Sequence, residues 1–234
     1  MSTHIFIIFH SKIFDECYSR IPRDVLKNNF TFVAVNPTIP KSYTQNKYNV
    51  INEWELPVYN PDLQRLNHKE NSVLHHVHAN GLHLPHKKVG FFQYDMNFNK
   101  INMVKFLHNM DPRLCYVFDE SDYHHAFITT YWMYDDYKEL IFNDYEKHFN
   151  KKIDFNRTFP LFNSFIIDST IYSKMMNFLS PVYIKYTHII DNNSSNYIAG
   201  LYERFTALVL SQEDLYFEKI NHIHHDLELK RQAC

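Results

Sequence analysis

Two polar residues that follow an apolar run are the first candidates for chemistry in this chain. Asp95 and Asn97 come shortly after the apolar residues 89–92 and are two positions apart. Side chains alternate along extended backbone, so both are expected to project to the same side where this strand surfaces. Oxygen ligands of this kind suit a hard divalent cation that holds a pyrophosphate. The alternative is an ordinary turn, which Asp and Asn both favour.

Polar residues also end two apolar runs nearer the N-terminus. His10 follows the run at 4–9, and Asn36 follows the run at 30–35. Ligands of parallel α/β sheets bind beyond the carboxyl ends of the strands. We therefore expect His10, Asn36 and Asp95 to lie along one edge of a sheet.

The elements that must position these residues alternate between strands and helices. Strands are expected at 4–9, 30–35, 88–93, 114–118, 162–167 and 215–220, with a short one near 48–52 inside a loop spanning 37–66. Helices are expected at 12–20, 69–80, 102–109, 134–149, 169–179 and 199–211. Because the strands are almost continuously apolar, they predict a sheet covered on both faces. The expected fold is α/β, with a mostly parallel central sheet, helices on both faces, and one domain over residues 1–234.

Composition excludes several classes of protein. The chain has 234 residues, a formal net charge of −2 and a hydrophobic fraction of 45%. A general nucleic-acid binder normally has a basic face, so that class is disfavoured. Three well-separated cysteines make neither a zinc motif nor a disulfide framework. No apolar run is long enough for a membrane span or a signal peptide, so a soluble cytoplasmic protein is expected.

Glycine usage excludes the common phosphate-binding loops. The chain has only three glycines, Gly81, Gly90 and Gly200. The dinucleotide-binding fingerprint, the P-loop and the nucleophile elbow each need glycines a few residues apart. Any phosphate is therefore expected to be held by side chains or a metal ion.

Four segments in this order carry a resemblance to a known family. They are residues 70–80, 90–97, 162–167 and 199–205. Together they resemble the GT-A glycosyltransferases of large DNA viruses and of related bacterial surface-polysaccharide enzymes. The resemblance implies the GT-A fold, a nucleotide-sugar donor, usually a uridine diphosphate sugar, and a Mn²⁺ or Mg²⁺ ion. It also implies a nucleotide-binding half over about 1–110 and an acceptor-binding half over about 111–234.

The family's D-x-D motif maps onto Asp95 and Asn97. The second position departs from the pattern, since it is Asn97 rather than an aspartate. A neutral amide binds a divalent ion more weakly than a carboxylate, so weaker metal binding is expected. A histidine near the C-terminus completes the metal shell in some of these enzymes, which makes His222 a third candidate ligand. His10 and Asn36 are then expected near the base or ribose of the donor.

The resemblance also assigns residues to the acceptor side. Glu203 is the candidate general base on the acceptor hydroxyl, and Arg204 is expected to neutralise phosphate or to orient Glu203. Asn163 and Ser164 are candidate contacts to the transferred sugar or the acceptor. The alternative for each pair is an ordinary structural role on a helix surface or in a sheet.

Two other functions stay open. A sugar nucleotidyltransferase would share this fold class, although a glycine-rich and basic loop is absent after the first strand. A catalytically inactive sugar- or protein-binding module is the other, and Asn97 is its best support. The loop at 37–66 is a candidate gate over the donor.

Overall fold

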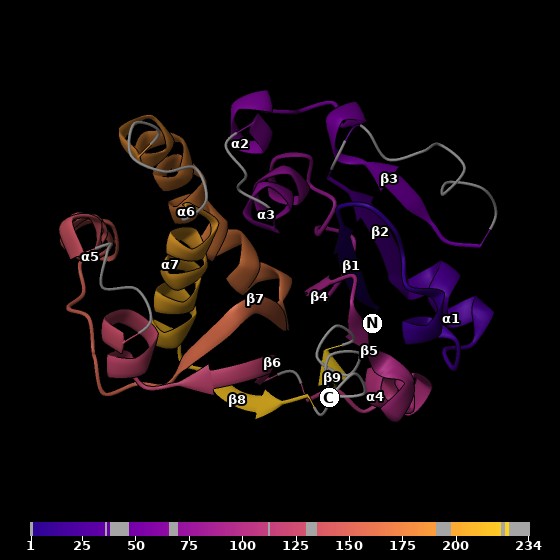
Figure 1. The fold of residues 1–234 in the computed structure, drawn as a ribbon. Helices are drawn as coiled ribbons and strands as arrows, with labels where there is room; N and C mark the ends of the chain where they lie inside the picture. Colours follow the sequence, from indigo (N-terminus) through magenta and orange to yellow (C-terminus); the bar gives the residue numbers. More distant parts are fainter. Residues whose placement is uncertain are drawn as a thin grey trace, which may run out of the picture.

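The computed structural model describes residues 2–35, 37, 47–65, 70–111, 113–129, 135–190, 198–220 and 223–224. Seven strands form one sheet in the order β3-β2-β1-β4-β7-β6-β8 (Figure 1). Their bounds are β1 Thr3–Phe9, β2 Phe30–Ala34, β3 Val50–Asn52, β4 Lys88–Gln93, β6 Leu114–Ser121, β7 Phe159–Asp168 and β8 Tyr216–Lys219. Only β7 runs against its neighbours, β4 and β6, and the other four pairings are parallel. The prediction of a mostly parallel sheet is confirmed.

Helices cover both faces of this sheet. Alternation along β1 sends Phe6 and Ile8 into one hydrophobic core and Ile5, Ile7 and Phe9 into the other. The first core is covered by α2 Pro61–Arg65, α3 Glu70–Ala79, α5 Asp135–Phe149, α6 Ser169–Ile190 and α7 Ile198–Gln212. The second is covered by η1 Asp15–Tyr18, α1 Arg23–Asn29, η4 Phe98–Lys100 and α4 Met103–His108. A strand between two such layers must be apolar at every position, which explains the continuous runs in the sequence.

The centre of the sheet depends on a glycine. A Cβ added at Gly90 of β4 would lie 2.8 Å from Cγ1 of Ile166 and 3.3 Å from Cγ1 of Ile5. The missing side chain therefore makes room for the isoleucines of β1 and β7 on either side.

A second, small sheet lies beside the end of β4. It pairs β5 Met96–Asn97 with β9 Ile223–His224 in antiparallel register. The C-terminal segment thereby comes next to the predicted metal-binding pair, 126 residues away in sequence from Asn97 to Ile223.

Three expectations about local structure are wrong. Residues 12–20 contain only the short η1, and the helix of this region is α1, which starts after Pro22. The helix expected to end at 179 continues through Pro181 to Ile190 as α6, because the residues beyond the proline are buried against α7. The loop at 37–66 includes the expected short strand, as β3, but its described part also contains η3 Glu53–Glu55 and α2, which the sequence did not predict. The other expected strands and helices are confirmed.

Among the helices that the structure describes, none is both long and apolar enough to cross a lipid bilayer. The division into two halves near residue 110 stays a prediction.

Candidate active site

Several of the predicted residues lie at one edge of the sheet. His10 follows β1 and Asp95 follows β4, and these two strands are parallel neighbours. Because β7 is antiparallel to β4, with Phe91 opposite Phe165, its earlier residue Asn163 lies beside the end of β4. Asn36 lies outside the described residues.

His10 faces the beginning of α3. Its Nε2 lies 3.7 Å from Oε1 of Glu70, and its ring centroid lies 5.9 Å from that of Tyr94, edge to face. The His10 side chain is 35% exposed and that of Glu70 is 12% exposed. Together they place a carboxylate and an imidazole, both partly open to solvent, at the carboxyl edge of β1.

Asn71, the next residue of α3, joins three elements through its side chain. Its Oδ1 accepts a hydrogen bond of 2.9 Å from Nδ2 of Asn163, and its Nδ2 donates one of 3.1 Å to the carbonyl of Ala199 in α7. The hydroxyl of Tyr183 in α6 lies 3.4 Å from the same Oδ1 and 2.8 Å from Oγ1 of Thr206. Asn71 is fully buried, so this network fixes β7 and α7 against the start of α3.

Asn163 has a strained backbone and an oxygen that the network does not use. Its φ is 48°, the left-handed region that is costly for most side chains. The side chain is 6% exposed, and its Oδ1 has no hydrogen-bond partner among the described residues. Both features are typical of functional sites. Ser164, the next residue, is completely buried.

Asp95 does not surface as expected. It lies in the turn at 94–95 between β4 and β5 and is only 3% exposed. Its charge contributes to the raised pKa of Tyr18, after burial and the neighbouring Cys17. The hydroxyl of Tyr18 donates to the carbonyl of Tyr94 at 2.6 Å, so Asp95 is held beside a buried phenol.

Asn97 has a role in its own turn. Its Oδ1 accepts a hydrogen bond of 3.0 Å from the backbone N–H of Asn99 and caps η4. Asn97 therefore has the turn-forming role that the sequence predicts as the alternative to metal binding. A carbonyl oxygen has two lone pairs, so this contact leaves one for another partner.

Two of the three predicted metal ligands, Asp95 and Asn97, lie among the described residues. Among all the described residues there is no group of three or more histidines, cysteines or carboxylates that could hold an ion. Asp95 and Asn97 offer two oxygens, and Mg²⁺ is commonly held by one or two carboxylates together with substrate phosphates and water. His222 lies outside the described residues, although β9 brings the adjacent Ile223 beside Asn97.

Glu203 and Arg204 contact each other in α7. Nη1 of Arg204 lies 2.8 Å from Oε1 of Glu203, and the two side chains are 5% and 16% exposed respectively. They lie one helical turn beyond Ala199, whose carbonyl binds Asn71. This contact is what an orienting role of Arg204 requires, and the catalytic role of Glu203 stays a prediction.

A cavity of about 360 Å³ opens beyond the carboxyl end of β1. Its lining comes from the segment after His10 and from the residues before β3: Lys12, Ile13, Phe14, Asp15, Glu16, Lys47 and Tyr48. The ammonium of Lys12 lies 4.3 Å from the ring centroid of Phe14, and the hydroxyl of Tyr48 donates to Asp15. Aromatic rings and ammonium groups in one cavity can contact a base and a phosphate.

Sequence reasoning missed Glu70, Asn71 and this cavity. The available signal was the polar pair Glu70-Asn71 at the start of a helix that otherwise has buried residues, including Val73, Leu74 and Val77. A fully buried asparagine in the first turn of a helix has to find partners in other elements.

The comparisons with known proteins support the fold. No protein-family model and no curated protein matches the chain. Among solved structures it is similar to WbbM, a bifunctional glycosyltransferase in its apo state, with a TM-score of 0.59 and 12% sequence identity. The match covers 95% of this chain and 45% of that protein, so the chain spans less than half of WbbM. The chain therefore has a glycosyltransferase-like fold.

Proposed function

We propose that the chain is a glycosyltransferase that moves a sugar from a nucleotide-diphosphate donor to a glycan or glycoprotein acceptor. A uridine diphosphate sugar is the first candidate donor. The main support is the similarity to a glycosyltransferase over 95% of the chain. The polar residues gathered at the carboxyl edge of β1 and β4 agree with it, because ligands of such sheets bind there.

The donor is proposed to lie along this edge. The cavity beside Phe14 and Tyr48 takes the nucleoside, with His10 near the ribose or the first phosphate. Asp95 and Asn97 are the residues proposed to hold Mn²⁺ or Mg²⁺. Such an ion, when bound, neutralises the negative charge that develops on a departing diphosphate.

The acceptor is proposed to enter from the side of β7 and α7. Asn163 has a buried amide oxygen that the network does not use, and an amide oxygen can accept a hydrogen bond from a sugar hydroxyl. Glu203, oriented by Arg204, is the proposed base for the acceptor hydroxyl. Glu70 is a second carboxylate at the same edge: it lies beside His10, and its neighbour in sequence, Asn71, is bound by Asn163.

The decisive experiment measures nucleoside diphosphate released from a panel of nucleotide sugars with Mn²⁺ present. Asp95→Asn keeps the size of the side chain and removes its charge, so turnover is expected to fall by about 100-fold or more, as for other lost electrostatic contacts. Asp24→Asn, an exposed position on α1, is the matched control and should keep full turnover. Thermal unfolding verifies that both variants fold. Unchanged turnover in Asp95→Asn removes this residue from the mechanism.

An inactive binding module is the second candidate, because Oδ1 of Asn97 is already engaged in its own turn. Calorimetric titration with nucleotide sugars, with and without Mn²⁺, separates the two. Metal-dependent binding together with turnover supports the transferase. Binding without turnover supports the module, and a wild-type chain that neither binds nor turns over any nucleotide sugar contradicts both.

A further inference from the structure

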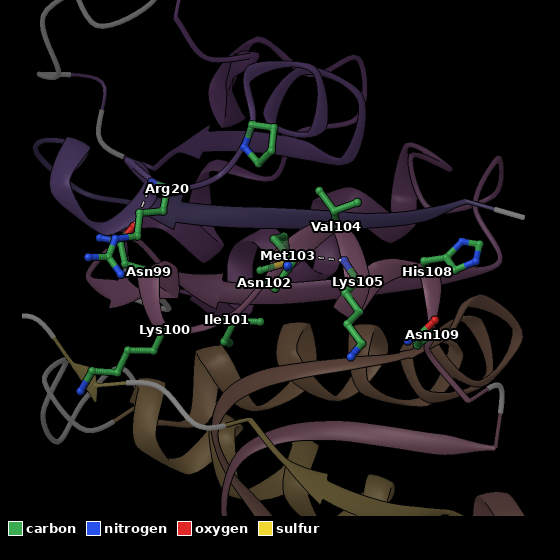
Figure 2. Close-up of a pocket in the computed structure, with 11 residues that line it drawn as sticks. Arg20, Asn99, Lys100, Ile101, Asn102, Met103, Val104, Lys105, His108 and Asn109 are labelled. Atoms are coloured by element: carbon green, nitrogen blue, oxygen red, sulfur yellow. Dashed lines mark hydrogen bonds between the residues drawn. The ribbon is translucent and has the colours of Figure 1, made fainter.

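Two adjoining cavities form one groove between α1 and α4. The first, of about 610 Å³, is lined by residues around η4 and α4 and by Arg20 and Pro22, which precede α1 (Figure 2). The second, of about 590 Å³, is lined by the starts of β1 and β4, by α1 and by the end of α4. Val104 and His108 line both cavities. We refer to the two together as the α1–α4 groove.

The lining of the α1–α4 groove carries one sign of charge. Its basic residues are Arg20, Lys87, Lys88, Lys100, Lys105 and His108. No aspartate or glutamate is among the described residues that line it. The whole chain has 24 lysines and arginines against 26 acidic residues, so this segregation does not follow from composition.

The cations of the groove differ in how far they are available to a ligand. Lys88 is 3% exposed and its Nζ donates to the carbonyl of Leu114 at 2.7 Å, so its role is structural. Arg20, Lys87 and Lys105 are exposed, and none of them belongs to an ion pair found among the described residues. Figure 2 shows Arg20 and Lys100 at one end of the first cavity, His108 at the other, and Lys105 between them.

Apolar side chains form much of the remaining wall. Ile101 and Met103 line the first cavity, Leu107 and Met110 line the second, and the shared Val104 is 51% exposed. Charges of one sign in a concave surface with apolar walls concentrate their field and attract a counter-ion more strongly than the same charges on a flat surface.

We propose that the α1–α4 groove binds a phosphate-bearing anion through Arg20, Lys87 and Lys105. Arginine and lysine are the side chains that bind phosphate most often, and cations spread over two adjoining cavities suit an anion with several charges. The second cavity lies at the starts of β1 and β4, at the edge opposite His10 and Asp95. This site is therefore separate from the proposed donor site and does not depend on it.

Inorganic tripolyphosphate is the probe, titrated calorimetrically into the full chain without divalent ions. The double variant Lys87→Gln, Lys105→Gln removes one exposed cation from each cavity, and affinity is expected to fall about tenfold, which corresponds to two modest charge contacts. The matched control, Lys147→Gln with Lys152→Gln, removes two lysines from the region of α5 and should stay within about twofold of wild type. Wild-type affinity should also fall steeply when salt is raised.

A second assay distinguishes a lipid headgroup from a soluble anion as the source of the phosphate. Co-sedimentation with phosphatidylcholine vesicles, with or without phosphatidylserine, tests for a lipid headgroup. Vesicle binding that needs phosphatidylserine and the two lysines identifies a lipid source, and tripolyphosphate binding alone identifies a soluble one. Equal losses in the groove and control variants, or no binding of either probe, would overturn the proposal. The Asp95→Asn variant should bind tripolyphosphate with wild-type affinity. The groove can therefore be tested even if the proposed transferase function is wrong.

Discussion

Asn163 adopts a left-handed backbone conformation inside β7, where such a conformation is rare. Its φ is 48°, and its Nδ2 donates to Asn71 from a position that is 6% exposed. The register between β6 and β7 shifts at this point, between Val117 and Asp119. The buried hydrogen bond to Asn71 therefore holds Asn163 in this strained backbone conformation.

Two substitutions at this position separate strain from side-chain contact. Asn163→Gly and Asn163→Ala both lose the bond to Asn71, but only alanine keeps a Cβ that opposes a positive φ. We expect both variants to be less stable than wild type and Asn163→Gly to be more stable than Asn163→Ala by about 1 kcal/mol. Urea unfolding of the matched pair measures the difference. An alanine variant as stable as the glycine variant would show that this position is not strained.

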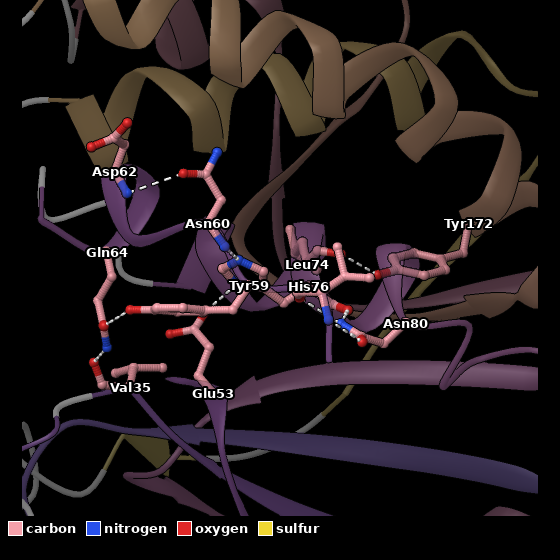
Figure 3. A network of polar contacts seen from close by, with 11 residues as sticks. Val35, Glu53, Tyr59, Asn60, Asp62, Gln64, Leu74, His76, Asn80 and Tyr172 are labelled. Carbon is pink, nitrogen blue, oxygen red and sulfur yellow. Dashed lines mark hydrogen bonds and ion pairs between the residues drawn. The ribbon is translucent and has the colours of Figure 1, made fainter. Parts of the chain in front are cut away.

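A buried polar network ties the segment after β3 to α3 (Figure 3). Nδ1 of His76 lies 2.7 Å from Oε1 of Glu53, and both side chains are completely buried. The backbone N–H of Asn60 donates to Nε2 of His76 at 2.8 Å, so this nitrogen carries no proton and Nδ1 donates to Glu53. The side chain of Gln64 then links Tyr59 to the carbonyl of Val35. His76, in α3, is therefore bonded both to η3 and to Asn60, the residue just before α2.

Removing the imidazole should loosen this connection. His76→Leu leaves a buried carboxylate and a buried N–H without their shared partner, which is expected to cost about 3 kcal/mol of unfolding free energy. His78→Leu, on the same helix but half-buried, is the matched control and should cost about 1 kcal/mol or less. Chemical denaturation gives the free energies, and hydrogen exchange should show faster exchange over 53–65 only in His76→Leu. Equal effects of the two substitutions contradict this role.

Buried histidines make the stability of the whole molecule depend on pH. Burial lowers the pKa of His4 and of His75 from 6.5 to about 4, with smaller contributions from the neighbouring His86 and His76 respectively. The pKa values of His78, His83 and His86 are also lowered, mainly by burial. Between about pH 6.5 and the lowered pKa of each site, the unfolded chain binds a proton that the folded chain does not.

The free energy of unfolding is therefore expected to fall as pH is lowered from 6.5 to 4. For His4 and His75 the loss is about 3 kcal/mol each at the lower limit, because one pKa unit corresponds to about 1.4 kcal/mol. Urea unfolding at a series of pH values measures the slope, and His4→Gln or His75→Gln should reduce it. A slope that neither variant changes would assign the acid sensitivity to other groups.

Local patterns in the sequence are enough to predict the layers of the fold. The apolar runs that became β1, β2 and β4 have to lie between two covered faces, because a sheet covered on one face buries only alternate residues, and every residue of β1 and β2 is buried. The sequence also predicts His10 and Asp95 at strand ends, because His10 directly follows one apolar run and Asp95 lies three residues after another. Each of these inferences depends on a pattern that spans only a few neighbouring residues.

Which residues contact each other, and how exposed each one is, depends on the packing of distant segments. A strand covered on both faces is equally apolar in either direction, so the sequence could not show that β7 runs antiparallel to β4. Asn71 and Asn163 are 92 residues apart, and nothing local to either predicts their hydrogen bond. The burial of Asp95 follows from Tyr18 and the turn around it rather than from its neighbours in sequence. Contacts of this kind depend on how the chain packs as a whole, and a pattern within one segment contains no information about them.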